Sequence, residues 1–292
     1  MKKSSMNYSK IISGTMSWGK WGKQFNTEEM ISLINHCIEH DLTTFDHADI
    51  YGDYTTEADF GKALSKCSIN RESIQLISKC GIQYFTETRN NKVKHYNYTK
   101  DYIVWSVEES LKHLKTDYLD ALLLHRPSPL MEPNEIMEAL AKLAQEGKIN
   151  DFGVSNFTPS QIDLIASEVP VTINQVEFSL TQNQAMFDGT LDQTKIKKIT
   201  PMAWSPLGIV FKEDTEQTRR IHKQLGELMD KYNATEDQLL LAWIMKHPSS
   251  IHPVIGTTDK NRITNAIKAI EIELEVEDWF LILVASQGHK VP

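Results

Sequence analysis

The chain has 292 residues, of which 40% are hydrophobic and 24% are charged, and its formal net charge is −8 at pH 7. This composition supports a large buried core and excludes an intrinsically disordered chain. Acidic residues outnumber basic residues by 39 to 31. The balance argues against a surface for nucleic acid or for an anionic membrane, because both need clustered positive charge.

The sequence lacks the usual signals for export or membrane insertion. No run reaches the roughly 18 apolar residues of a membrane-spanning helix, and the opening MKKSS has no apolar signal-peptide core. The three cysteines, Cys37, Cys67 and Cys80, have no CxxC spacing, which favours reduced thiols. We therefore expect a cytoplasmic protein without a membrane partner, and the sequence indicates no oligomeric state.

Short apolar runs alternate with amphipathic helices along the whole chain. The first helix is predicted to begin after Asn26, which has the capping-box spacing to Glu29. Further helix starts are marked by Thr99, Thr158 and Thr235. The candidate strands are residues 11–15, 43–46, 75–79, 119–125, 152–155, 172–176, 201–205 and 254–257.

Eight strands that each precede a helix predict an α/β fold with a parallel sheet. The sheet is either open and doubly wound or closed as a (β/α)8 barrel. An open dinucleotide-binding sheet should carry GxGxxG after its first strand, whereas residues 14–19 read GTMSWG. The count of eight and the missing motif favour a (β/α)8 TIM barrel, formed by residues 1–292 as a single domain.

Polar residues follow three successive predicted strands, at the barrel end where chemistry occurs. Asp46 ends the second strand and Tyr51 follows it, while Lys79 ends the third strand and His125 ends the fourth. A neighbouring ammonium lowers the pKa of a tyrosine hydroxyl from about 10, and a histidine can orient a carbonyl oxygen. The four residues therefore describe a general acid for carbonyl reduction. The alternatives are a turn aspartate, a packed tyrosine and a structural ion pair.

Six motifs in the same order and spacing resemble the aldo-keto reductase family. FDHADIYG at residues 45–52 resembles the family's FDTAxxYG, and SK at 78–79 and HRP at 125–127 match its other catalytic positions. The remaining motifs are GVSNF at 153–157, NQVE at 174–177 and AWSPL at 203–207. The resemblance implies NADPH-dependent reduction of small-molecule aldehydes or ketones, with Tyr51 as the proton donor. The closing GHKVP also resembles a bacterial subgroup of oxidoreductases.

The resemblance also implies contacts with the nicotinamide of NADP. Ser155, Asn156 and Gln175 would hydrogen-bond its carboxamide, which needs both donors and acceptors. Trp204 would stack on the ring, and the alternative is one more core aromatic residue.

Other cofactor contacts are implied for strand-end segments, which otherwise are ordinary turns. Gly14 and Thr15 would line the cofactor cleft. The residues that would border the pyrophosphate are Ser205, Pro206 and Leu207.

Most relatives in this family also carry an amino-terminal hairpin that plugs the bottom of the barrel. Only about ten residues precede the first predicted strand here, so we expect a shortened or absent plug.

The adenine end is predicted at the start of the helix after the eighth strand. Thr257, Thr258 and Arg262 would bind the 2′-phosphate, since a helix start with hydroxyls and an arginine suits an anion. Many relatives place a lysine where Gly256 stands, and Asp259 adds a negative charge. The alternative is a capped helix start with solvated charges.

The predicted substrate pocket is mostly aromatic. Its expected walls are Trp18, Trp21 and residues 81–101 and 126–134. These walls suit apolar or aromatic carbonyls, while Arg89 and Asn90 leave sugars or acids open.

A metal site is not expected, because His47 and Asp49 offer only two ligands at i and i+2. The runner-up function is a binding module that senses nicotinamide nucleotides with weak turnover, as in some members of the superfamily. The intact group of four polar residues favours the enzyme, and NADPH consumption with simple aldehydes would distinguish the two.

Overall fold

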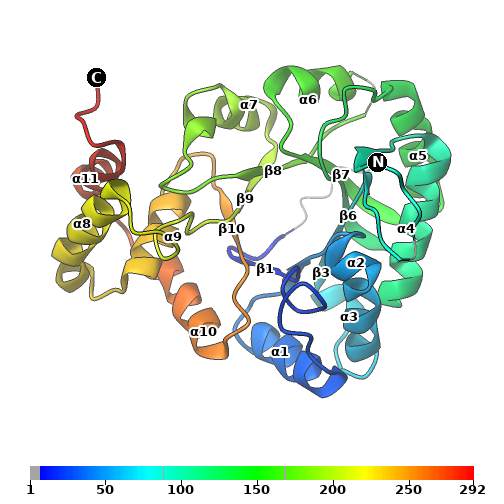
Figure 1. The fold of residues 1–292 in the computed structure, drawn as a ribbon, viewed down its shortest axis with the longest axis horizontal. Helices are drawn as coiled ribbons and strands as arrows, with labels where there is room; N and C mark the ends of the chain where they lie inside the picture. The colour runs from blue at the N-terminus through cyan, green and yellow to red at the C-terminus, as the bar shows by residue number, and fades with distance from the viewer. Residues whose placement is uncertain (1–6, 88, 168) are drawn as a thin grey trace. The chain divides into compact units, whose positions relative to one another are not determined.

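The computed structural model describes residues 7–87, 89–167 and 169–292. The barrel strands are β1 (Ile12–Gly14), β2 (Thr44–Asp46), β3 (Gln75–Cys80), β6 (Leu119–Leu124), β7 (Ile149–Ser155), β8 (Ile173–Glu177), β9 (Thr200–Trp204) and β10 (His252–Ile255). They form a closed barrel in the order β1-β10-β9-β8-β7-β6-β3-β2 (Figure 1). The predicted (β/α)8 architecture is therefore confirmed.

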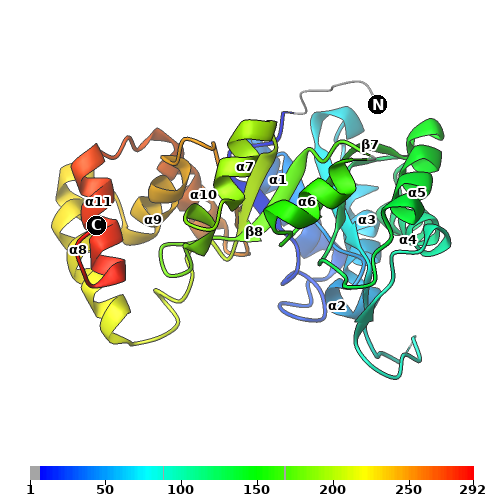
Figure 2. The ribbon, with the colours of Figure 1, turned by 90° about the horizontal axis from the view of Figure 1, so that it is seen from above.

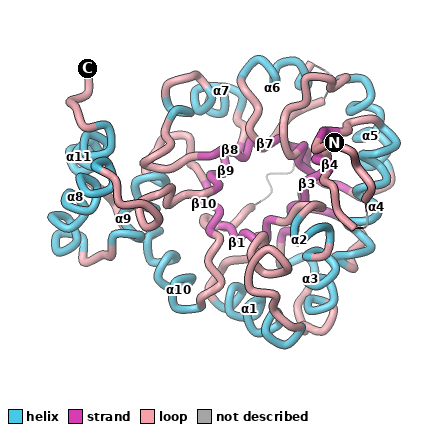
Figure 3. Tube along the Cα trace, in the orientation of Figure 1, coloured by secondary structure: helices cyan, strands magenta, loops and turns pink. Residues whose placement is uncertain are grey.

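The chain divides into two compact units, residues 1–175 with 256–258 and residues 176–255 with 259–292. The assignment of residues 1–292 to a single domain stays a prediction. The helices of the first unit are α1 (Thr27–Glu39), α2 (Tyr51–Tyr54), α3 (Thr56–Leu64), α4 (Lys100–Leu114), α5 (Pro133–Gln145) and α6 (Pro159–Ala166), with a 3-10 turn at Arg71–Ser73. In Figure 3 the strands of this unit lie inside the layer that α3, α4 and α5 form, and Figure 2 shows α4 beside α5.

Local sequence signals set the helix starts of the first unit. Asn26 accepts hydrogen bonds from the backbone of Glu28 and Glu29, and the Glu29 carboxylate accepts one from the Asn26 backbone in return. Thr99 and Thr158 also cap their helices through the side-chain oxygen. Each cap satisfies backbone N–H groups that have no partner inside the helix, so these predicted starts are confirmed.

The parallel register of the first unit brings strand ends together. Asp46 on β2 pairs with Gly14 on β1 and with Ile77 on β3. Ser155 on β7 pairs with Gln175 on β8. All six residues of β6 are buried, as expected for a parallel strand that is covered on both faces. Polar residues at the carboxyl ends of these strands therefore share one edge.

The segment after β3 contains a small hairpin that the sequence analysis treats as loop. Its strands are β4 (Ile82–Gln83) and β5 (His95–Tyr96), which pair antiparallel with Ile82 opposite Tyr96. Two-residue strands are too short to produce a readable alternation of apolar and polar residues.

The second unit packs around stacked aromatic rings. Its helices are α7 (Thr190–Lys197), α8 (Glu216–Tyr232), α9 (Glu236–Met245), α10 (Lys260–Lys268) and α11 (Val276–Gln287), with 3-10 turns at Gln184–Met186 and Ala269–Glu271. The Trp243 and Trp279 rings stack with centroids 4.9 Å apart, and each indole N–H donates to the other residue's carbonyl. Figures 1 and 2 show α8 and α11 side by side. The helix start predicted at Thr235 is confirmed, and a capping box of Thr235 and Gln238 opens α9.

The expected short or absent amino-terminal hairpin falls partly on residues 1–6, which lie outside the described residues. Residues 7–11 contain no strand before β1. Across the described ranges, every helix is too short or too polar to span a membrane.

Candidate active site

A buried lysine, Lys79, contacts two of the other predicted catalytic residues in the first unit, Asp46 and Tyr51. Lys79 Nζ donates to Asp46 Oδ2 at 2.7 Å, to the His47 carbonyl oxygen at 2.8 Å and to the Tyr51 hydroxyl oxygen at 3.2 Å. Asp46 and Lys79 are almost fully buried, whereas Tyr51 is partly exposed. An ammonium can only donate, so the Tyr51 oxygen accepts and its own proton stays available for another acceptor.

A left-handed turn follows Tyr51. Gly52 has a φ of 59°, and a Cβ at this position would lie 2.4 Å from Thr56 Oγ1. Only glycine takes this conformation without a steric penalty and fits the space. In the Tyr-Gly pair of the motif, the backbone conformation therefore requires Gly52, while Tyr51 supplies the chemical group.

Burial dominates the electrostatics of Tyr51. It raises the pKa of the hydroxyl above its ordinary value, while the Lys79 ammonium lowers it and the Asp46 carboxylate raises it. From the sequence, Lys79 was expected to lower this pKa. Its influence has that sign, but loss of solvation of the phenolate outweighs it. Tyr51 is therefore protonated at neutral pH, the form that donates a proton.

Lys79 is positively charged, whereas His125 is neutral. Burial lowers the pKa of Lys79, but Asp46 and Tyr51 together raise it above the ordinary value, so the ammonium is retained. Burial, then Lys79, lowers the pKa of His125 well below the usual range. His125 is therefore a neutral imidazole at neutral pH.

His125 directly follows β6 and lies beside the tyrosine. Its backbone N–H donates to the Cys80 carbonyl at 2.9 Å, and its ring meets the Tyr51 ring edge-on with centroids 6.1 Å apart. Among the described residues, its Nδ1 has no hydrogen-bond partner. A neutral ring in this place can donate one N–H to an oxygen near Tyr51.

The three residues predicted to bind a carboxamide are linked to one another and to Asp46. Ser155 Oγ donates to the Gln175 carbonyl and accepts from Asn156 Nδ2, both at 2.8 Å. Gln175 Nε2 donates to Asp46 Oδ1 at 2.9 Å. Hydroxyl and amide groups, which supply both donors and acceptors, thus lie next to Asp46, the carboxylate that pairs with Lys79.

Thr15 is buried, and its side chain binds the protein itself. Its hydroxyl donates to the Asp46 carbonyl at 3.0 Å and contacts His47 Nδ1 at 2.9 Å. Gly14 pairs with Asp46 in the barrel. Burial, with a smaller effect from Lys79, lowers the pKa of His47 to about 3. The Thr15 side chain therefore stabilises the carboxyl end of β2 through hydrogen bonds to Asp46 and His47.

The predicted residues of the second unit lie at two strand-to-helix turns. Trp204 ends β9 and is partly exposed, and Ser205, with a φ of 50°, accepts from the Gly208 backbone at 2.8 Å. Pro206 is buried, and Leu207 is partly buried.

The start of α10 carries a carboxylate of its own. Asp259 is its N-cap and accepts from the Arg262 backbone at 3.0 Å, while Arg262 is exposed in the first turn. In the first unit, Thr257 and Thr258 are partly buried. A phosphate at this helix start would therefore meet Asp259 as well as Arg262.

The structure corrects part of the predicted substrate wall. Trp18 is fully buried and packs against Phe45 and Phe60, so it cannot line a pocket. Trp21 does lie near the tyrosine: its ring is 6.1 Å from that of Tyr51 and 6.0 Å from that of Tyr84. Distant packing partners decide between these two tryptophans, and the sequence does not reveal them.

Arg89, predicted as a polar group of the substrate wall, instead packs on the protein. Its guanidinium lies 3.6 Å from the centroid of the Tyr54 ring and 4.8 Å from that of the Trp105 ring. It also donates to the Tyr102 hydroxyl at 3.2 Å. It therefore fastens the segment after β3 to α2 and α4.

Asp49 lies behind this arginine as a buried carboxylate. Tyr102 and Ser106 donate to Asp49 Oδ2 at 3.2 and 3.1 Å. Burial raises its pKa to about 6, although Arg89 and the two hydroxyls oppose the shift. From the sequence, Asp49 is weighed only as a metal ligand, and no local pattern marks its role as the hydrogen-bond partner of helix α4.

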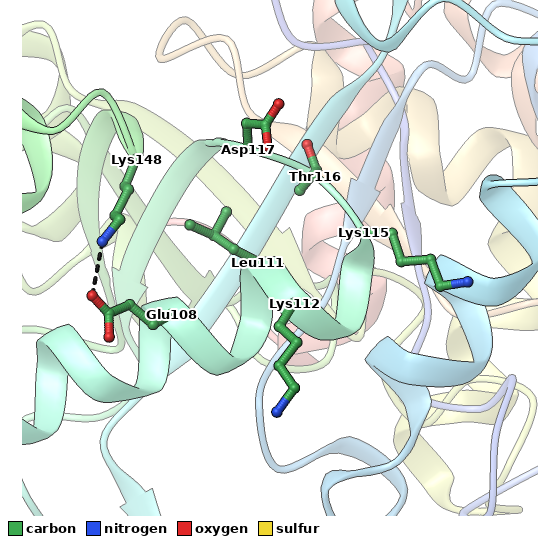
Figure 4. Close-up of a pocket in the computed structure, with 7 residues that line it drawn as sticks. All are labelled: Glu108, Leu111, Lys112, Lys115, Thr116, Asp117 and Lys148. Carbon is green, nitrogen blue, oxygen red and sulfur yellow. Dashed lines mark hydrogen bonds and ion pairs between the residues drawn. The ribbon is translucent and has the colours of Figure 1, made fainter.

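A surface pocket lies away from these residues (Figure 4). It is lined by Glu108, Leu111, Lys112, Lys115, Thr116, Asp117 and Lys148. Asp117 and Lys148 precede β6 and β7, so the pocket is at the amino ends of these strands, whereas His125 follows the carboxyl end of β6. Lys148 is paired with Glu108 at 2.8 Å. These are surface charges remote from the candidate active site.

A closed barrel with polar residues at the carboxyl ends of its strands is an architecture that many unrelated enzymes share. The model of the aldo/keto reductase family matches residues 10–283. The chain belongs to this family and is one of its oxidoreductases.

Similar proteins agree with this assignment. The chain is 42% identical to "Uncharacterized oxidoreductase YcsN" of Bacillus subtilis (strain 168), over 98% of this chain and 97% of that protein. It is 35% identical to "6-dehydroglucose reductase" of Agrobacterium fabrum, over 88% of each chain. A crystal structure of the thermostable aldo-keto reductase Tm1743 with the inhibitor epalrestat has a TM-score of 0.83 and 27% identity, over 97% of both chains.

Proposed function

We propose that the protein reduces aldehydes or ketones with NADPH and that Tyr51 donates the proton to the carbonyl oxygen. The observation that carries this proposal is the contact between Lys79 Nζ and the Tyr51 oxygen at 3.2 Å. The ammonium occupies a lone pair of the oxygen and leaves the hydroxyl proton for the substrate. It also stabilises the phenolate that remains after the transfer.

Asp46 and His125 complete the arrangement. Asp46 keeps Lys79 charged inside the protein, since a buried ammonium without a partner would lose its proton. His125 is neutral and donates a hydrogen bond to the carbonyl oxygen, which orients it toward Tyr51. General acid assistance of this kind contributes about 10²–10⁴-fold in rate.

The residues near Asp46 fit the carboxamide of a nicotinamide. When bound, NADPH supplies the hydride that reduces the carbonyl carbon. Ser155, Asn156 and Gln175 provide the hydroxyl and amide groups that a carboxamide pairs with. Gln175 Nε2 already donates to Asp46. We therefore assign the side-chain oxygen of Gln175, Oε1, as the acceptor for the carboxamide.

The remaining cofactor contacts are proposed from the family resemblance. Arg262 is assigned to the 2′-phosphate, and Trp204 to the nicotinamide ring. The other assigned residues are Gly14, Thr15, Ser205, Pro206, Leu207, Thr257 and Thr258. We also propose a cytoplasmic location, where NADPH is available.

The substrate class is proposed from the site and from the names of relatives. Trp21, near Tyr51, and Tyr84, which contacts Trp21, favour carbonyl compounds with an apolar or aromatic body. The relatives named "6-dehydroglucose reductase" add a sugar aldehyde to the compounds to test.

The test is a substrate screen that follows NADPH absorbance with purified protein. The panel contains aromatic aldehydes, aliphatic ketones and 6-dehydroglucose, and Tyr51→Phe is the matched variant. We expect turnover in the wild type and a loss of about 10²–10⁴-fold in the variant. NADPH binding without turnover of any carbonyl would overturn the proposal and favour a nucleotide-sensing module.

A further inference from the structure

The carboxyl end of helix α1 and its cap residue carry three side chains of types that can bind a metal, outside the candidate active site. His36, Glu39 and His40 are spaced i, i+3 and i+4 near its carboxyl end, so they share one face. Ligand atoms of the two imidazoles and the carboxylate all lie within 4.8 Å of one another. The two imidazole centroids are 4.3 Å apart, at an interplanar angle of 41°.

One of the two rings has its tautomer defined by the backbone. His40 Nδ1 lies 2.9 Å from the His36 carbonyl oxygen. A carbonyl oxygen can only accept, so Nδ1 carries the proton and the lone pair of the neutral ring is on Nε2. Metal-ligating histidines are commonly held in this way, with the second nitrogen donating to a backbone carbonyl.

The surroundings favour a cation. The carboxyl end of a helix carries partial negative charge, and Glu39 adds a carboxylate. Both histidines are partly exposed and Glu39 is exposed, so an ion can reach the site from solvent and keep water as further ligands.

We propose that His36, Glu39 and His40 bind one divalent transition-metal ion, with Zn²⁺ as the first candidate. Two imidazole nitrogens and one carboxylate oxygen suit Zn²⁺, Co²⁺, Ni²⁺ or Cu²⁺ better than Mg²⁺ or Ca²⁺, which prefer oxygen ligands alone. The expectation of no metal site rests on His47 and Asp49, which offer only two ligands, and on the absence of HxH and HExxH. The HxxEH spacing at residues 36–40 is the signal that it misses.

The ion would join the last turn of α1 to its cap residue. An ion that binds only the folded protein stabilises it by RT ln(1 + [M]/Kd), where [M] is the concentration of free metal, so the unfolding temperature rises with metal concentration. The proposal is independent of carbonyl reduction, because none of its ligands belongs to the candidate active site.

The test is a titration of tag-free, full-length protein with Co²⁺, read by visible absorption, and with Zn²⁺, read by calorimetry and by thermal unfolding. The variants are His36→Ala, His40→Ala and the double substitution, which alanine's high helix propensity should allow to fold. The matched control is His113→Ala on α4. His113 Nε2 lies 3.8 Å from Glu109 Oε2 at i, i+4, so this variant also removes a helical histidine near a carboxylate, but outside the proposed metal site.

We expect one equivalent of Co²⁺ or Zn²⁺ in the wild type and in His113→Ala. His36→Ala and His40→Ala should each weaken metal binding by more than about tenfold. Even residues that only hydrogen-bond to metal ligands contribute about 10–100-fold to metal affinity. Zn²⁺ at a concentration that saturates the wild type should raise the unfolding temperature of the wild type and the control, by less in each single variant, and not in the double variant. Absence of one-equivalent binding in the wild type, or its persistence in the double variant, would overturn the proposal.

Discussion

Gln175 donates a hydrogen bond from Nε2 to Asp46 Oδ1 at 2.9 Å, across 129 positions of sequence. The other oxygen of the same carboxylate accepts from Lys79 at 2.7 Å. One buried carboxylate therefore links the residue assigned to the cofactor amide with the lysine that contacts Tyr51. Changes on either side of Asp46 are expected to affect the other side.

Replacement of Tyr51 by phenylalanine tests the proton donor. Tyr51→Phe keeps the ring that packs near Trp21 and His125 and removes the hydroxyl. We expect kcat for carbonyl reduction to fall by about 10²–10⁴-fold, with the Kd for NADPH unchanged. Steady-state kinetics and Trp fluorescence quenching measure the two quantities. Wild-type turnover in the variant would show that another group supplies the proton.

Replacement of Lys79 by methionine tests the electrostatic role of the ammonium. Lys79 lowers the pKa of Tyr51 against the effect of burial, so its removal raises this pKa further. Tyr51 then stays protonated to higher pH but is a weaker acid. The alkaline limb of the kcat–pH profile should move to higher pH, and kcat should fall nearly as far as in Tyr51→Phe.

Lys79→Met also leaves the buried Asp46 carboxylate without its ion-pair partner. Breaking a buried ion pair from one side costs about 3–5 kcal/mol of stability, which denaturant unfolding measures. Asp46→Asn combined with Lys79→Met removes both charges and should recover part of this stability without recovering kcat. An unshifted, undiminished pH profile in Lys79→Met would contradict the assigned role.

Gln175→Leu tests the link through Asp46. The substitution removes a donor from a buried carboxylate, which should cost about 1–3 kcal/mol of unfolding free energy. It also removes an amide partner, so NADPH affinity should fall by up to about tenfold. The control is Gln182→Leu at an exposed glutamine, where both quantities should stay near wild type. Unchanged NADPH affinity in Gln175→Leu would remove Gln175 from the cofactor site.

Glu57 should make the protein less stable as pH rises. Burial raises the pKa of this carboxyl to about 7, although Ser78 donates to it at 2.5 Å and opposes the shift. The unfolded chain has the ordinary value of about 4.3, so between these pH values the folded state binds the extra proton. Stability from this group is present below about pH 4.3 and is lost as pH rises to about 7.

Glu57→Gln isolates this effect from the buried histidines, whose lowered pKa values, such as that of His47, give the opposite slope. Glutamine keeps an oxygen for Ser78 and does not titrate. The stability of the variant relative to wild type should therefore improve by up to roughly 3 kcal/mol between pH 4.5 and pH 8. Denaturant unfolding at several pH values measures the difference, and a constant difference would contradict the raised pKa.

Cofactor preference is expected to depend on opposite charges at the start of α10. A charge-assisted hydrogen bond contributes about 1.5–3 kcal/mol, or roughly 10–150-fold in affinity. Arg262→Ala should weaken NADPH by such a factor and leave NADH unchanged. Asp259→Ser keeps an N-cap oxygen and removes a negative charge, so it should tighten NADPH selectively. Kd values for both cofactors decide, and equal changes for NADPH and NADH would mean that these residues only support the helix.

The sequence by itself determined the fold class and the identity of the candidate catalytic residues. Apolar runs, turn residues and caps such as Asn26 with Glu29 act over a few positions, so they remain readable without a structure. All eight predicted strands are present, with ends that shift by up to three residues. Their parallel order puts Asp46, Lys79 and His125 at one edge of the first unit.

Tertiary structure alone decided how these side chains are solvated and which partners they meet. Trp18 is buried whereas Trp21 lies near Tyr51, and Arg89 packs on Tyr54 and Trp105 instead of facing a substrate. The net pKa of Tyr51 is raised because burial outweighs Lys79. Desolvation depends on all the atoms packed around a group, and most of these come from distant parts of the chain, so no local pattern encodes it.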